Sequence, residues 1–89
     1  MDERAKLKLL FFAGLREQLG RGNEDLELPP GVGTVAALRA HLMGRGEAWQ
    51  AALAANRVLR VAVNQDMAQP STSIKPGDEV AFFPPVTGG

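Results

Sequence analysis

Apolar and polar residues alternate along several segments of the chain, and this pattern predicts β-strands with one buried face. In the first segment, counting by two places Leu7, Leu9 and Phe11 on one face. The same count places Leu10 and Phe12 with two lysines on the opposite, solvated face. The predicted strands are 6–13, 24–28, 58–64 and 79–83. The first strand therefore presents two large apolar side chains outward.

Helical spacing appears in the segments between these strands. Thr34 can cap a helix that runs to residue 43 or 44, with its apolar residues on one stripe at 35, 38 and 42. Residues 15–20 predict a short helix that Gly20 ends. The alanine-rich segment 47–55 predicts either a third short helix or an irregular connection, and 65–73 predicts a loop or a short edge pairing.

The order of these elements is strand, strand, helix and then strands. The helices are too few to cover both faces of a sheet, so we expect an α+β fold with one mixed sheet and helices packed on one face. Two adjacent N-terminal strands, a helix across the sheet and a last strand beside the first fit the β-grasp architecture of ubiquitin. The sequence thus predicts a single domain over 1–89 with a flexible C-terminal tail at 84–89.

The composition of the chain excludes several classes of function. The 89 residues are 45% apolar and carry ten basic and ten acidic side chains, so no basic excess favours a nucleic acid as partner. No uncharged stretch approaches the roughly 20 apolar residues of a membrane span, and residues 1–4 lack the order of a secretory signal. We expect a cytoplasmic protein. The absence of cysteine excludes thiol nucleophiles, disulfides and zinc-thiolate sites.

The side chains offer no catalytic constellation. The single histidine, His41, lies off the apolar stripe of its helix and is expected to be a surface residue, neither a general base nor a metal ligand. Ser71 and Ser73 lack a nucleophile-elbow motif. The segment 31–34 lacks the third glycine of a dinucleotide site and the lysine of a phosphate loop. The sequence therefore predicts no bound metal or cofactor, and either a passive binding module or chemistry located in the backbone.

The C-terminus is the candidate for that chemistry. From residue 80 to the end there is no charged side chain. Pro84 and Pro85 donate no backbone hydrogen bond and favour an extended exit from the sheet, and the six residues from Pro84 onward span at most roughly 20 Å. Gly88 and Gly89 lack side chains, so the terminal carboxylate can enter a narrow channel. A frayed terminus or an expression remnant is the alternative interpretation of the diglycine.

Several segments resemble the small-subunit family of molybdopterin synthase. The resemblance covers most of the chain, and the long C-terminal segment is its most specific part. The matching segments are Leu10–Ala13 with Leu15–Glu17, Thr34–Val35 with Ala37–Arg39, Ala62–Gln65 and Gly77–Gly89.

This resemblance implies a sulfur carrier. The carboxylate of Gly89, preceded by Gly88, would be adenylated by a ubiquitin-activating-type enzyme that consumes ATP. A sulfur donor protein would then supply the sulfur of a thiocarboxylate. The carrier would insert this end into the large subunit and give its sulfur to precursor Z, which forms the dithiolene of molybdopterin. The chain would thus belong to a heterotetrameric enzyme of two small and two large subunits, without active-site side chains of its own.

The resemblance also implies a surface that contacts the large subunit. Strand parity independently turns Phe12 outward, and exposed aromatic residues on a sheet face often mark a partner surface. The alternative is that these side chains pack beneath loops or short helices. For Arg16 and Arg39 the alternatives are contact with a partner and a solvated charge, and we expect the solvated charge. The implied contact residues are Phe12, Met67, Phe83, Pro84, Pro85, Val86 and Thr87.

Three other functions remain open at this stage. A ubiquitin-like modifier would join lysine amines through Gly89. A carrier of the same architecture could instead supply sulfur to thiamine or to transfer RNA. A passive binding module would not need its last two residues at all.

Overall fold

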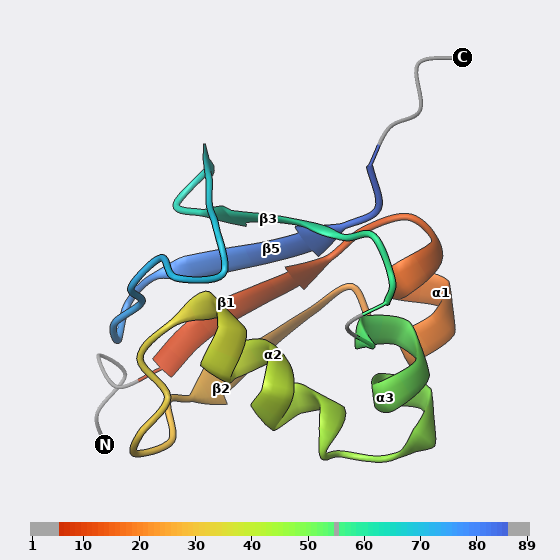
Figure 1. The fold of residues 1–89 in the computed structure, drawn as a ribbon, viewed down its shortest axis with the longest axis horizontal. Helices are drawn as coiled ribbons and strands as arrows, with labels where there is room; N and C mark the ends of the chain where they lie inside the picture. Colours follow the sequence, from red (N-terminus) through yellow and green to blue (C-terminus); the bar gives the residue numbers. More distant parts are fainter. Residues whose placement is uncertain (1–5, 55, 86–89) are drawn as a thin grey trace.

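A computed structural model describes residues 6–54 and 56–85, and its five strands form one mixed sheet (Figure 1). The spatial order is β2-β1-β5-β3-β4. The central strand β5 runs parallel to β1 and antiparallel to β3, while β2 and β4 pair antiparallel at the two edges. The strands are β1 (Lys6–Phe11), β2 (Asn23–Glu27), β3 (Arg60–Val63), β4 (Asp66–Met67) and β5 (Glu79–Phe83). All four predicted strands are present, with ends that differ by at most two residues, and the placement of the last beside the first is confirmed.

Three helices complete this α+β fold: α1 (Gly14–Leu19), α2 (Val35–Met43) and α3 (Glu47–Leu53). The hydroxyl oxygen of Thr34 accepts a hydrogen bond of 3.1 Å from the backbone N–H of Ala37 and caps α2, as predicted. Gly20 ends α1 in the left-handed conformation at φ 76°. The segment 47–55 is a helix as far as Leu53. None of the helices in the described ranges is long and apolar enough to span a bilayer.

The core lies between one face of the sheet and the helices, as the two layers in Figure 1 show. Strand parity predicted the inward side chains of β1 correctly, because Leu7, Leu9 and Phe11 are all at most 1% exposed. They pack with Val80 and Phe82 of β5 and with the apolar stripe of α2. The helical residues in this cluster are Leu15, Val35, Leu38, Leu42, Ala52 and Leu53. The predicted arrangement of helices on one face of the sheet is confirmed.

The strand predicted at 58–64 is shorter in the structure. Pairing begins at Arg60, and of the three side chains predicted to be buried only Val61 is fully so. Leu59 and Val63 stay half-buried because the neighbouring edge strand has two residues and covers little of their side of the sheet. The segment 65–73 does contain a short edge pairing, β4, and Ser73 also bridges to Thr34.

A hydrogen-bonded turn joins the β3–β4 hairpin to the start of β5. Asn64 and Gln65 adopt positive φ angles of 52° and 72°, which suit a tight hairpin turn. The side-chain amide of Asn64 donates to the Asp78 carboxylate at 3.0 Å, and its oxygen accepts from the N–H of Glu79 at 3.0 Å. The hairpin that carries Met67 is therefore held to the central strand by side-chain hydrogen bonds as well as by the backbone hydrogen bonds between β3 and β5.

Asp78 is the buried anchor of this turn, at 5% exposure. Burial alone would raise the pKa of its carboxyl, but hydrogen bonds from Asn64 and from the backbone and side chain of Lys75 outweigh burial and lower the pKa below the ordinary value. The ionised form thus stabilises the folded chain above the unfolded carboxyl pKa of about 3.8, and this contribution is lost as the pH falls through the lower folded value.

Replacement of Asp78 by Asn is expected to lower the free energy of unfolding by about 1–3 kcal/mol at pH 7, because the hydrogen bonds from Asn64 and Lys75 lose their charged acceptor. Urea denaturation of the two proteins at a series of pH values measures the effect. The difference between them should be full at pH 7 and shrink once the pH drops below about 3.8. A difference that stays constant down to the most acidic condition would show that the carboxylate charge is not its source.

Candidate functional site

The face of the sheet turned away from the helices carries a row of apolar side chains. The strand register places Leu10 opposite Ala81, Ala81 opposite Ala62, and Ala62 opposite Met67. Residues directly opposite each other point to the same face. This row therefore crosses four strands, and it ends at Met67, whose side chain is 61% exposed on the edge strand.

A second row lies one step closer to the end of β5. Phe83 is opposite Arg60, and Phe12 continues the register of β1 because its N–H donates to the carbonyl of Phe82 at 3.3 Å. Phe12 is 48% exposed and Phe83 half-buried. We call these two rows together, without the arginine, the open-face patch: Leu10, Phe12, Ala62, Met67, Ala81 and Phe83. Phe12 and Met67 are uncovered, which contradicts the alternative that they pack beneath loops or helices.

The other end of the same face is charged. In the strand register Lys8 lies opposite Glu79 on one side and opposite Asp25 on the other, and Lys6 lies opposite Glu27. These side chains alternate in sign, so they favour water over an apolar partner surface. The open face is thus divided into a charged half at the start of β1 and β5 and an apolar half at their ends.

The predicted tail begins in the apolar half. β5 is the middle strand of the sheet, and its pairing ends at Phe83 because Pro84 and Pro85 have no N–H to donate. Both prolines are half-buried and follow directly after the strand. The remaining predicted site residues, Val86, Thr87, Gly88 and Gly89, lie outside the described residues. The structure thus brings Phe12, Phe83 and the start of the tail together, with Met67 on the same face.

Sequence reasoning missed part of this surface. Ala62 and Ala81 join the larger side chains into one patch, and strand parity alone could have identified both. Val58 is 73% exposed in the irregular segment just before β3. The strand predicted at 58–64 included this residue, but pairing begins only at Arg60, so strand parity does not fix the direction of its side chain.

Arg39 is not the solvated charge that the sequence suggested. Its guanidinium donates to the carbonyl oxygens of Leu53 at 2.6 Å and Ala54 at 2.5 Å, and to that of Arg57 at 3.2 Å. Partial burial lowers its pKa below the ordinary value of an arginine. The side chain thus ties α2 to the end of α3 and to the segment before β3, a tertiary contact that no local pattern reports. Arg16 is exposed, as is His41.

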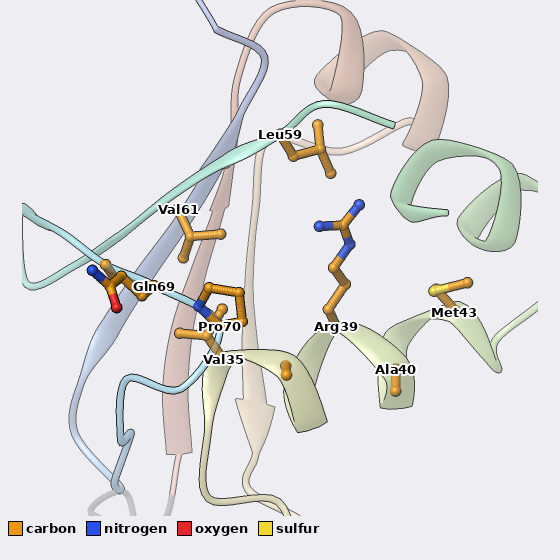
Figure 2. Close-up of a pocket in the computed structure, with 10 residues that line it drawn as sticks. Val35, Arg39, Ala40, Met43, Leu59, Val61, Gln69 and Pro70 are labelled. Atoms are coloured by element: carbon orange, nitrogen blue, oxygen red, sulfur yellow. The ribbon is translucent and has the colours of Figure 1, made fainter. Parts of the chain in front are cut away.

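Arg39 also lines a groove on the helix side of the molecule. Figure 2 shows its side chain extending from α2 towards Leu59, with Val61 and Pro70 on the neighbouring wall. The groove encloses about 320 Å³ and is mostly apolar. The Nε and Nη2 donors of this guanidinium are bound to backbone carbonyls, which holds the side chain in place along the groove.

The comparison with known protein families and curated relatives agrees with these features. The ThiS family model matches residues 9–89. A molybdopterin synthase sulfur carrier subunit of Haemophilus influenzae is 43% identical over 83 residues, which cover 93% of this chain and 99% of that protein. The protein of the same name from Escherichia coli matches with the same identity and coverage. The relatives and this chain therefore correspond over nearly their whole lengths.

Solved structures show the same fold. Small archaeal modifier protein 1 of Haloferax volcanii superposes with a TM-score of 0.71 at 26% identity, covering 92% of this chain and 99% of that one. Subunit 1 of the molybdopterin-converting factor of Helicobacter pylori, solved in a complex with subunit 2, gives a TM-score of 0.62 at 24% identity and covers 94% of this chain and 99% of that one. With the family model spanning all but the first eight residues, the chain belongs to the ThiS family.

Proposed function

We propose that this protein is the sulfur carrier subunit of a molybdopterin synthase. The observation that carries the proposal is the diglycine C-terminus, which follows a central strand ended by two prolines beside an exposed apolar patch. The relatives from Haemophilus influenzae and Escherichia coli are named for this role and match over nearly the whole chain. No active-site side chain is required of the carrier, because its reacting group is the terminal carboxylate.

The chemistry begins with activation of that carboxylate. A carboxylate resists substitution because oxide is a poor leaving group. An adenylyltransferase joins the Gly89 carboxylate to the AMP part of ATP and releases pyrophosphate. A persulfide of the donor protein then attacks the carbonyl carbon and expels AMP, which forms an acyl disulfide. A second thiol attacks the donor sulfur of this disulfide, which releases the thiocarboxylate and leaves a disulfide on the donor. The chain end thus acts as a covalent carrier in the sense of nucleophilic catalysis.

The fold supplies a partner-binding surface and an extended tail for this chemistry. The open-face patch offers a partner surface whose apolar side chains lose water on binding. The tail begins at the edge of the patch, and its six residues can carry the thiocarboxylate at most about 20 Å from Phe83. A partner that covers the patch can therefore receive the tail in a channel while the body stays outside.

The partner in this scheme is the large subunit of molybdopterin synthase. In it the thiocarboxylate gives its sulfur to precursor Z, and water supplies the oxygen that restores the carboxylate of Gly89 for another cycle. The adenylyltransferase and the sulfur donor are two further partners, and ATP is consumed by the first of them. Two carriers and two large subunits form the assembly.

Intact-mass measurement tests the proposal. The purified protein is incubated with ATP, the adenylyltransferase and a sulfur donor, and the expected product is heavier by the difference between one sulfur and one oxygen atom. Omission of ATP is the matched control and should leave the mass unchanged. An unchanged mass in the full reaction, under conditions that load an established carrier, contradicts the proposal.

A ubiquitin-like modifier is the second candidate, favoured by the superposition on the Haloferax volcanii modifier protein. It would use the same adenylated Gly89 but transfer it to lysine amines of other proteins. No lysine or arginine follows Lys75, so trypsin would leave a long C-terminal peptide ending in Gly88-Gly89 on each modified lysine. Such peptides linked to lysines in the native cell extract, lost when Gly89 is deleted, would identify this function. A carrier that serves only molybdopterin synthesis leaves no such peptides.

A further inference from the structure

All three lysines of the chain surround one turn at the start of β5. Lys75 begins the turn, and its ammonium lies 3.3 Å from the Asp78 carboxylate. The carbonyl of Lys6 accepts from the N–H of Gly77 at 2.9 Å, and the N–H of Lys8 donates to the carbonyl of Asp78 at 2.9 Å. Because β1 and β5 are parallel, this turn lies at the end of the sheet opposite to the exit of the tail.

The basic residues near the exit are arginines. Arg60 is paired with Phe83, the last residue of β5, and is exposed on the open face. Arg57 precedes it in the segment that leads into β3 and is also exposed. Among the described residues neither guanidinium has a carboxylate within salt-bridge distance. Positive charge is thus available beside the tail without an amine.

The distance between the lysines and the exit exceeds the reach of the tail. Lys8, the lysine nearest to the exit, lies level with Glu79, six residues before Pro85, which is about 20 Å along the strand. The extended lysine side chain brings the Lys8 amine about 6 Å closer to the exit, to about 14 Å from Pro85. Residues 86–89 span at most about 14 Å when fully extended, and a reversal of direction uses part of that length in a turn, so the tail falls short of this amine. By contrast, Arg60 is level with Phe83, about 7 Å before Pro85.

We propose that this separation of amines from the exit protects the activated C-terminus from capture by the chain's own lysines. The inference rests on the proposed function, in which Gly89 passes through an acyl adenylate. An unprotonated lysine amine would attack that carbonyl, form an amide, release AMP and lose a proton to water, and the carrier would be closed into a ring. A guanidinium stays protonated at neutral pH and does not make this attack.

The chemistry suggests a role for Arg60 as well. A lysine at this position would keep the positive charge but bring a nucleophile within reach of the tail. Intramolecular attack is favoured by a high effective concentration once the two groups can meet. Arg60 is therefore a selectivity residue: it supplies charge beside the strand exit without adding a lysine that would compete with sulfur transfer.

The test uses the full-length chain with Gly89 converted to a small alkyl thioester, which reacts with amines in the same way but needs no activating enzyme. Wild type, Arg60→Lys, Arg60→Gln and Asp25→Lys are incubated at mildly alkaline pH and low protein concentration. Asp25→Lys is the matched control because it adds an exposed amine level with Lys8. Mass spectrometry separates the intramolecular amide from the hydrolysed acid, which is heavier by one water, and fragmentation locates the bond.

Arg60→Lys is expected to form the internal amide at least about tenfold faster than wild type, with the bond at position 60 and a rate independent of protein concentration. Wild type, Arg60→Gln and Asp25→Lys should mainly hydrolyse. The inference is overturned if wild type closes through Lys6, Lys8 or Lys75 as fast as Arg60→Lys closes, or if Arg60→Lys does not close. Because no adenylyltransferase is used, these outcomes are independent of whether the sulfur-loading experiment succeeds.

Discussion

Deletion of Gly89 is expected to abolish sulfur loading while leaving the melting temperature unchanged. Loading requires the terminal carbonyl carbon to sit at the phosphate of ATP in the adenylyltransferase, and loss of one residue withdraws it by about 3.5 Å. Misplacement of a reacting group by about 1 Å already costs about 100-fold in rate, so at least that loss is expected. The described core ends at Phe82, so the deletion removes no core side chain.

Two measurements check this prediction together. Intact-mass analysis follows loading over time, and thermal unfolding monitored by circular dichroism follows stability. A full-length chain that ends in a carboxamide is the matched control: it keeps every residue but lacks the acid, and it should also fail to load. Loading of the shortened chain at the rate of the full-length protein would contradict the assignment of Gly89 as the reacting residue.

The second large effect is expected from Met67→Asp. Met67 is 61% exposed at the end of the apolar row on β4, so the substitution removes little core packing. In a complex that covers the open-face patch, the new carboxylate would be buried without a partner, which is costly. The dissociation constant for the large subunit should rise at least about 100-fold, which corresponds to about 3 kcal/mol.

Isothermal titration of the two purified subunits measures this effect. Ala48→Asp is the matched control, because Ala48 is also exposed but lies in the first turn of α3, where an acidic residue is favoured. It should leave the dissociation constant within a factor of two or three. If Met67→Asp binds as tightly as Ala48→Asp, the large subunit does not use the open-face patch.

Local patterns in the sequence predicted most of the fold. Alternation identified the inward residues of β1 because one face of that strand is fully buried, and a one-residue error would place Leu7 and Leu9 in water. Thr34 and Gly20 marked helix ends through backbone hydrogen bonding and a positive φ angle, which depend on residues close in sequence. The same parity turned Leu10 and Phe12 outward, so the part of the candidate surface that lies on β1 was predictable.

Contacts between distant residues were not predictable in this way. Glu24 on β2 binds Arg45 in the connection after α2 at 2.5 Å, and Arg45 lies 4.5 Å from the ring centre of Trp49. These partners meet only after α2 and α3 have packed on the sheet. The bonds of Arg39 to the end of α3 and the burial of Asp78 arise in the same way. Composition predicts such charges to be solvated, because most are.

The central position of β5 has a mechanical consequence. A partner that draws the tail into a channel pulls along the axis of this strand, away from the turn at its start. Since β5 has a neighbour on each side, such a force loads both hydrogen-bonded ladders at once and in shear. An edge strand pulled outward would instead separate one bond at a time. The folded domain is therefore expected to resist a pulling force on its tail without unfolding. It can then dissociate from the partner in its folded form after each sulfur transfer.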